Sequence, residues 1–299
     1  MKVLNFGSLN LDYVYQMESI LIPGETQASK SRQTFCGGKG LNQSIALAKA
    51  GVPVYHAGLI GEDGEPLLEV CRENGVNTEF IRKISGSSGH TVIQVDKDGQ
   101  NCILLFGGSN RSITREFVDS VLESFSEGDM ILLQNEINEL SYIIDCAYKK
   151  KMMIVLNPSP YDRELEGCDL SKISLFLMNE IEGYQITGEK DPEAILCKMR
   201  ELYPTAETVL TLGGDGSVYQ NDIGIYKQGI YRVKAVDTTA AGDTFTGYFI
   251  ASILDQMPVA DGLKMAAKAS AIAVSRPGAT SSIPLRSEVM ESCLHCDET

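Results

Sequence analysis

The chain has 299 residues, 43% of them hydrophobic and 22% charged, which is enough to bury the core of one large α/β domain or two smaller ones. Its 26 Lys and Arg residues are outnumbered by 40 Asp and Glu residues, so the formal net charge is -14. This excess of negative charge repels a phosphate backbone and no basic cluster offsets it, so we expect no nucleic-acid partner.

No apolar stretch is long enough to cross a bilayer, and the N-terminus lacks the basic start and apolar run of a secretion signal. We therefore expect a cytoplasmic protein with no membrane partner. The eight cysteines are scattered, which favours reduced thiols over a disulfide framework. Cys293 and Cys296 have the spacing of a metal or redox pair, but the further ligands or the helix start that such a site needs are missing from the sequence around them.

Short apolar runs alternate with longer helical patterns through most of the chain. Val3 to Phe6 predicts a buried strand, and Met130 to Gln134 predicts another. A helical pattern over Leu140 to Lys150 then leads to a strand at Met152 to Leu156. Strands that are apolar on both faces are typical of a parallel sheet covered by helices. We predict a three-layer α/β/α sandwich with a mostly parallel central sheet, forming a single domain over residues 1–299. Two further strands are expected at Ser174 to Met178 and at Thr208 to Leu212.

Two segments, residues 10–36 and 90–106, interrupt this alternation. In the second segment, two β-rich runs flank Asp96-Lys97-Asp98-Gly99, a sequence that favours a hairpin turn. We predict that both segments form a small β-sheet lid on the α/β body. The run from Cys102 to Phe106 is apolar on both faces, and such a strand needs a cover. We therefore expect a homodimer that forms through the lid.

A glycine-rich run from Gly37 to Asn42 precedes a helical pattern that ends at Gly51. Glycines let a ligand approach the backbone closely, and Asn42 lies in the first turn of the predicted helix. The run is not a Walker A loop, because Lys39 is followed by Gly40. A turn that merely joins the lid to the helix remains the alternative interpretation.

The strongest local signal is the run from Val236 to Gly247, in which small residues precede the apolar pattern of a helix. Uncovered backbone N–H groups at such a helix start, together with the positive end of the helix dipole, form an anion site. Asp243 lies at its edge, where a carboxylate repels phosphate but can take a proton from an attacking hydroxyl. From the residues alone, an ordinary helix cap remains the alternative.

Weaker signals lie on or after other predicted strands. Asn10 and Asp12 alternate, so their side chains share a face, as hydroxyl-binding groups must. Asn179 to Glu182 follows a strand, at the edge where open α/β sheets bind ligands, although a helix cap also accounts for it. The turn from Thr211 to Gly216 could cradle nucleotide phosphates. The three histidines are scattered, which argues against a metallohydrolase or a triad hydrolase.

Taken in this order, the segments from residue 3 to residue 286 resemble the PfkB/ribokinase family of carbohydrate kinases. The first signature of that family is similar to Gly37 to Gly51, and its second is similar to Asp237 to Gly247. The resemblance implies ATP-dependent phosphorylation of the primary hydroxyl of a sugar, with D-ribose to ribose 5-phosphate as the expected reaction and Asp243 as the catalytic base. It also implies ATP, Mg²⁺ and an activating K⁺ as cofactors.

The same resemblance implies a role for each matching residue. An anion hole is expected from Ala240, Ala241 and Gly242. Sugar binding is expected from Asn10, Asp12, Gly38, Lys39, Asn42 and Glu136. Nucleotide binding, with Mg²⁺ and phosphate placement for the first two, is expected from Asn179, Glu182, Thr211, Gly213 and Gly216. Binding of the monovalent cation is expected from Asp237, Thr239, Arg276, Gly278 and Ser282. His90 and Gln94 depart from the expected lid pattern and could alter which sugar is held.

Two alternatives stay open. A nucleoside offers the same ribose hydroxyls plus a base, and a nucleoside kinase would need a larger pocket lined by lid aromatics such as Tyr13, Tyr15, Phe35 and Phe106. A non-catalytic sugar-binding regulator could keep the fold, although such a sensor has no need of Asp243.

Overall fold

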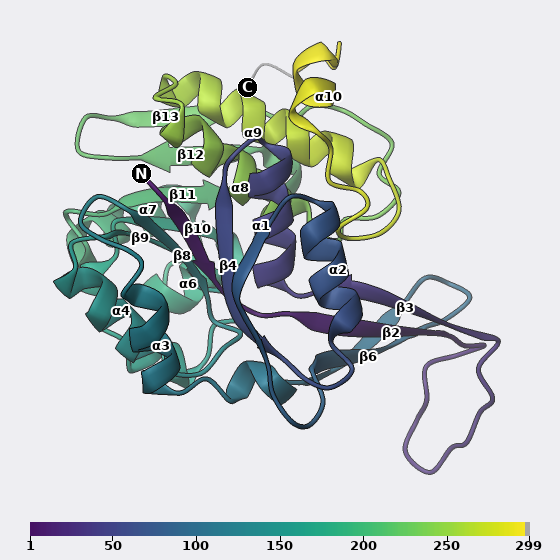
Figure 1. Ribbon diagram of the computed structural model, residues 1–299. Helices are drawn as coiled ribbons and strands as arrows, with labels where there is room; N and C mark the ends of the chain where they lie inside the picture. The colour runs from purple at the N-terminus through teal and green to yellow at the C-terminus, as the bar shows by residue number, and fades with distance from the viewer. Residues whose placement is uncertain (297–299) are drawn as a thin grey trace.

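A nine-stranded sheet forms the centre of the computed structural model, which describes residues 1–296 (Figure 1). The strand order is β13-β12-β11-β10-β9-β8-β1-β4-β5. All neighbours from β11 to β5 pair in parallel, and β12 and β13 join antiparallel at one edge. The predicted, mostly parallel central sheet is confirmed.

For the five predicted strands of this sheet and the helix predicted over residues 140–150, the predicted boundaries agree with the observed ones to within one residue. The strands of this sheet are β1 (Val3–Phe6), β4 (Val54–Ile60), β5 (Asn77–Lys83), β8 (Met130–Gln134), β9 (Met153–Asn157), β10 (Leu175–Asn179), β11 (Glu207–Thr211), β12 (Ser217–Gln220) and β13 (Ile225–Gln228). The α-helices are α1 (Lys39–Lys49), α2 (Glu65–Glu73), α3 (Arg115–Leu122), α4 (Leu140–Lys149), α5 (Arg163–Glu166), α6 (Glu180–Thr187), α7 (Pro192–Leu202), α8 (Ala241–Leu254), α9 (Val259–Val274) and α10 (Arg286–Glu291). Within residues 1–296, none of the helices combines the length and the apolar composition that a bilayer crossing requires.

Helices cover both faces of the sheet and enclose two hydrophobic cores (Figure 1). Because side chains alternate along a strand, Val3 of β1 enters the core beneath α1, α2, α8, α9 and α10. Leu4 and Phe6 enter the opposite core, which is closed by α3, α4 and α7. This is the predicted three-layer arrangement.

A separate four-stranded sheet projects from the body in the order β3-β2-β6-β7 (Figure 1). Its strands are β2 (Asn10–Gln16), β3 (Ser31–Gly37), β6 (Gly89–Val95) and β7 (Asn101–Phe106). The expected hairpin joins β6 to β7, with Gly99 in the left-handed region at φ 79°. We call this four-stranded sheet the lid.

The outer strand of the lid, β7, exposes apolar side chains on both faces. Ile103 is 57% exposed, Leu104 68% and Phe106 53%. Because β7 is also an edge strand, one row of its backbone hydrogen-bonding groups lacks a neighbouring strand within the described sheet.

The close packing of α1 against α8 brings the two signature segments together. A Cβ added at Gly247 of α8 would lie 2.4 Å from the Cβ of Ala46 in α1, so the absent side chain allows the two helices to approach. The first turns of α1 and α8 therefore lie side by side, although Asn42 and Asp243 are 201 positions apart in the sequence.

Candidate active site

Asp243 lies in the first turn of α8 and is 8% exposed. Its Oδ2 accepts a hydrogen bond from Asn42 Nδ2 at 2.9 Å, and its Oδ1 accepts one from Gln43 Nε2, also at 2.9 Å. Both donors come from the first turns of α1. A buried carboxylate needs such partners, and here two amides hold it without neutralising its charge.

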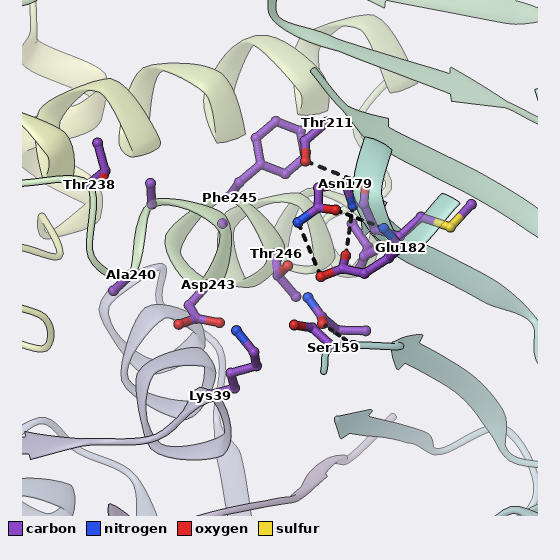
Figure 2. A pocket seen from close by; sticks show the side chains of 15 residues that line it. Lys39, Ser159, Asn179, Glu182, Thr211, Thr238, Ala240, Asp243, Phe245 and Thr246 are labelled. Atoms are coloured by element: carbon purple, nitrogen blue, oxygen red, sulfur yellow. Dashed lines mark hydrogen bonds between the residues drawn. The ribbon is translucent and has the colours of Figure 1, made fainter. Parts of the chain in front are cut away.

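The carboxylate lines a pocket of about 220 Å³ (Figure 2). The ammonium end of Lys39 points toward it from α1 in this view. Burial lowers the pKa of Lys39, but attraction by Asp243, Glu136 and Glu182 outweighs that effect and the net pKa is raised. Lys39 is therefore a cation at neutral pH, placed among three carboxylates.

The N-terminus of α8 forms another wall of this pocket. Ala240 precedes the helix in the left-handed conformation at φ 60°, an uncommon one for a residue with a Cβ. Ala240, Ala241 and Gly242 all line the pocket, and a Cβ added at Gly242 would meet nothing within 4 Å. The backbone N–H groups of this first turn can thus be approached by an anion.

Asn10 and Asp12 lie on one face of β2 and are held from neighbouring segments. Asn10 Oδ1 accepts from Asn110 Nδ2 at 2.7 Å, and Asp12 Oδ1 accepts from Thr91 Oγ1 at 2.5 Å. Burial raises the pKa of Asp12, the Thr91 hydrogen bond lowers it, and the nearby Glu136 raises it again, with a net increase. Polar groups therefore line one face of the lid sheet near the body.

Glu136 and Gly38 lie between this face and Asp243. Glu136 Oε2 accepts from the backbone N–H of Lys39 at 3.0 Å and from the Ser8 hydroxyl. Gly38 has φ 94°, and a Cβ there would lie 3.1 Å from Ser8 Oγ and 3.2 Å from Asn10 Nδ2. The glycine-rich turn therefore packs closely against the start of β2, so the two segments expected to bind the sugar lie side by side.

Asn42 carries a further indication of a ligand. Its Nδ2 is used by Asp243, but its Oδ1 is buried and has no hydrogen-bond partner within residues 1–296. A buried acceptor without a partner is costly, and a hydroxyl donor would relieve that cost.

Asn179 and Glu182 form a capping box at the start of α6. Asn179 Oδ1 accepts from the Glu182 N–H at 3.0 Å, and Glu182 Oε2 accepts from the Asn179 N–H at 2.8 Å. Both side chains also line the pocket beside Asp243 (Figure 2). The cap and the binding site were alternative interpretations of the sequence, but the structure combines them in one place.

A second, more apolar pocket of about 620 Å³ adjoins the first, and Thr211, Ala241 and Gly242 line both. Gly213 and Gly216 line it, with φ values of 53° and 93° that favour glycine. The two pockets together form one continuous path past the N-terminus of α8.

This fold and these two signature segments can be compared with those of known proteins. The model of the pfkB family of carbohydrate kinases matches residues 1–286. The chain belongs to this family.

Several relatives of this pfkB kinase match along nearly their whole length. The ribokinase of Haemophilus influenzae is 34% identical over 301 residues, which cover 97% of each chain. The ribokinase of Schizosaccharomyces pombe is 33% identical over 307 residues, which cover 96% of each chain. Among solved structures, the Arabidopsis thaliana ribokinase complexed with ribose and ATP superposes with a TM-score of 0.85, at 28% identity over 97% of each chain.

The residues expected to bind a monovalent cation are only partly gathered in this pfkB kinase. Asp237 Oδ1 accepts from the Thr239 hydroxyl at 2.6 Å, and Asp237 Oδ2 accepts from the Gly278 N–H at 3.0 Å. The Arg276 side chain pairs with Glu288 at 2.6 Å, so only the backbone carbonyl of Arg276 could offer oxygen to a cation. A fifth residue, Ser282, is fully buried and donates to the carbonyl of Ala279 at 2.8 Å.

His90 and Gln94 lie on the face of the lid opposite to the one that carries Asn10 and Asp12. The register sets Thr91 opposite Asp12, so His90 and Gln94 project to the other face of the sheet. His90 packs there against Phe106, with ring centroids 4.9 Å apart, and against Tyr13. On this geometry Thr91 is the lid residue that contacts Asp12, a role the sequence did not indicate.

Other residues of the site were also missed. Gln43, Ser8 and Asn110 each hold one of the expected binding residues, and none belongs to the predicted set. A usable signal existed for Gln43, since it belongs to the polar run Asn42-Gln43-Ser44 that directly precedes the apolar part of α1.

Proposed function

We propose that this pfkB kinase is a ribokinase that transfers the γ-phosphoryl group of ATP to the primary hydroxyl of D-ribose. One observation carries the proposal. Asp243 lies at the N-terminus of a 14-residue helix, in one pocket with Lys39, and Asn42 of the glycine-rich segment donates to its carboxylate. An anion site and a general base are needed together for phosphoryl transfer to an alcohol.

The sugar is assigned to the side of Asp243 that faces the lid. Asn10, Asp12 and Glu136 offer acceptors for several adjacent hydroxyls, and Asn42 Oδ1 offers a buried acceptor without a partner of its own. The ribokinases of similar sequence, and the Arabidopsis relative complexed with ribose and ATP, support ribose as the substrate. Recognition by several polar groups favours a sugar over an apolar alcohol.

ATP is assigned to the path formed by the two pockets. The larger pocket, bounded by Gly213 and Gly216, has the apolar lining that suits a nucleotide base. The smaller pocket then holds the terminal phosphates at the N-terminus of α8 and beside Lys39.

The chemical step follows from these positions. Asp243 accepts the proton of the sugar primary hydroxyl as its oxygen attacks the γ-phosphorus. A bond forms between that oxygen and phosphorus, the bond from phosphorus to the bridging oxygen of ADP breaks, and ADP leaves. The N–H groups of Ala241 and Gly242, with Lys39, stabilise charge on the transferred group.

Mg²⁺ and K⁺ fit the oxygen donors that are present. Glu182 lines the phosphate pocket and keeps lone pairs beyond those used in the cap, and Asp237 offers a carboxylate beside Thr239 and Gly278. Within residues 1–296, no group of three acidic, histidine or cysteine side chains is arranged to hold a metal ion by itself, so phosphates, waters and carbonyls would complete either shell. When bound, Mg²⁺ neutralises phosphate charge and K⁺ organises the loop beside the anion hole.

We further propose that the protein acts as one domain with its lid, as a cytoplasmic homodimer. The exposed apolar strand β7, at the edge of the lid, supports a second copy of the chain as its cover.

The direct test is an ADP-release assay with ATP, Mg²⁺ and K⁺ against D-ribose, 2-deoxyribose, fructose, ketodeoxygluconate and nucleosides. We expect turnover on D-ribose. Asp243→Asn should lower kcat by about 10²-fold to 10⁴-fold, since the amide cannot accept the proton. Asp261→Asn, on the exposed side of α9, is the matched control and should retain wild-type turnover.

Near wild-type turnover by Asp243→Asn would overturn the assignment of the base. Turnover on a nucleoside or another sugar alone would keep the mechanism and replace ribose as the substrate. No turnover on any of these compounds would favour the non-catalytic sugar-binding regulator.

A further inference from the structure

A row of polar side chains leads from Asp243 into the hydrophobic core. Gln43, Gln134, Asn5, Ser44 and His56 all have 0% exposed surface. The row lies beneath α1 and crosses the neighbouring strands β8, β1 and β4. Polar groups at such depth are costly unless their donors and acceptors are matched, so their pairing carries information.

The part of the row nearest the pocket consists of two glutamines. Gln43 Nε2 donates to Asp243 Oδ1 at 2.9 Å, and Gln43 Oε1 accepts from Gln134 Nε2 at 2.6 Å. The same nitrogen of Gln134 donates to Asn5 Oδ1 at 3.0 Å. Both hydrogens of the Gln134 amide are therefore used.

The far end of the row is tied to the backbone. Asn5 Nδ2 donates to the Gly40 carbonyl at 2.7 Å and to Ser44 Oγ at 2.8 Å. Ser44 Oγ lies 2.8 Å from His56 Nδ1, and His56 Nε2 lies 3.2 Å from the Gly7 carbonyl. A carbonyl can only accept, so His56 carries its proton on Nε2 and Nδ1 accepts from the Ser44 hydroxyl.

These carbonyls set the direction of every amide in the row. The Gly40 carbonyl requires the NH₂ group of Asn5, which turns Asn5 Oδ1 toward Gln134. Gln134 must then direct its NH₂ group at two oxygens, and its own Oε1 is left buried without a hydrogen-bond partner in the described chain. Gln43 presents its oxygen to Gln134, so its N–H groups face Asp243.

We infer that Gln43 is a positioning residue for Asp243, oriented from the core by Gln134 and Asn5. The inference rests on the proposed role of Asp243 as the base. A donor fixed by its neighbours holds Oδ1 in place, which leaves Oδ2, on the Asn42 side, for the sugar hydroxyl. The carboxylate is thus oriented before the sugar binds.

The first variant, Gln43→Met, removes the donor while keeping the length of the side chain. We expect kcat on ribose to fall by about 10-fold or more, with the KM values for ribose and ATP changed by less than about 3-fold. The ¹³C chemical shift of the Asp243 carboxyl should also change, because Oδ1 loses the Gln43 hydrogen bond; NMR of [4-¹³C]aspartate measures it, with Asp243→Asn for the assignment. Lys39, the charged group that faces Asp243 from α1, is unchanged in this variant.

The second variant, Gln134→Glu, tests the row itself. A carboxyl has at most one proton and cannot donate to both Gln43 and Asn5, although it matches glutamine in shape. We expect kcat and the ¹³C chemical shift of the Asp243 carboxyl to change in the same direction as in Gln43→Met, although residue 134 is bonded to neither Asp243 nor Asn42. Gln220→Glu is the matched control, because Gln220 lies in β12, is 6% exposed and donates to the Leu196 carbonyl of α7, away from the site.

A purely structural role predicts lower melting temperatures with unchanged kcat and an unchanged ¹³C chemical shift of the Asp243 carboxyl, and that result would overturn the inference. Should either variant fail to fold, Gln134→Met removes the same donor without introducing a carboxyl. The chemical shift does not depend on turnover. A wild-type protein inactive on every sugar would refute the proposed function, while the NMR comparison would still decide the orienting effect of Gln43.

Discussion

Burial determines the chemical state of His56. Its ring lies fully buried between the Ser44 hydroxyl and the Gly7 carbonyl, and burial lowers its pKa from 6.5 to about 4. The Gly7 hydrogen bond opposes this decrease without reversing it. At neutral pH the ring is therefore uncharged, as the hydrogen bond from Ser44 requires.

This state of His56 predicts a pH dependence of stability. The unfolded chain binds the His56 proton near pH 6.5 and the folded chain near pH 4, so the stabilisation is complete above pH 6.5 and is lost as the pH falls toward 4. The loss should total about 3 kcal/mol. Urea unfolding of wild type and His56→Phe should show a constant difference in free energy of unfolding above pH 7, which shrinks on acidification. A difference that stays constant down to pH 4 would contradict the buried, neutral histidine.

Five strands of the large sheet could be predicted from sequence because each is a short apolar run, whereas β5 and β13 are largely exposed and carry no such run. Met130 to Gln134 illustrates this, since burial on both faces leaves little ambiguity about where the strand lies. The same runs contained a second signal that was not used: Asn5, His56 and Gln134 are polar residues inside buried strands. Their partners could not be predicted, because the contacts join residues as far apart as Asn5 and Gln134 and depend on the order of strands in the sheet.

The site was predicted to the extent that it follows the two signature segments. Asp243, Asn42 and Lys39 come together because α1 and α8 pack side by side. Thr91 and Asn110 were missed because they act through Asp12 and Asn10 and have no local pattern of their own.

The contact between α1 and α8 predicts that replacing Gly247 by a larger residue lowers the stability of the protein. In Gly247→Ala the new Cβ would lie 2.4 Å from the Cβ of Ala46 and 2.8 Å from its backbone, so the helices must separate. We expect a loss of about 1 to 3 kcal/mol in the free energy of unfolding, with a fall in kcat because Asn42 and Asp243 move apart. Denaturant unfolding and steady-state kinetics measure the two effects. Gly224→Ala is the control, since its Cβ would meet only the Tyr226 ring at 4.0 Å, and equal stability of both variants would contradict the packing argument.

At the scale of the whole molecule, the unequal distribution of exposed apolar surface is the main feature. Ile103, Leu104 and Phe106 lie together on one edge strand of the lid. The formal net charge of -14 repels a second copy over most of the surface, so an association must gain its free energy from such a patch.

Leu104→Glu should therefore convert the proposed dimer to a monomer. A buried, unpaired carboxylate at the interface would be costly, whereas in the monomer it would be solvated. Sedimentation velocity at micromolar concentration measures the change. Ile223→Glu, at a residue that is 80% exposed in the turn between β12 and β13, should leave the association unchanged. A monomeric wild-type protein would refute the proposed dimer.

The central strand β1 continues into the lid strand β2 through residues 7–9 alone. Ser8 in this connection bonds Glu136, and Asn10 follows it at the start of β2. An outward rotation of the lid would therefore carry Asn10 away from the body. If Asn10 binds the sugar as proposed, the same rotation that opens the exit would remove a contact of the phosphorylated product, so its departure would need no separate weakening of affinity.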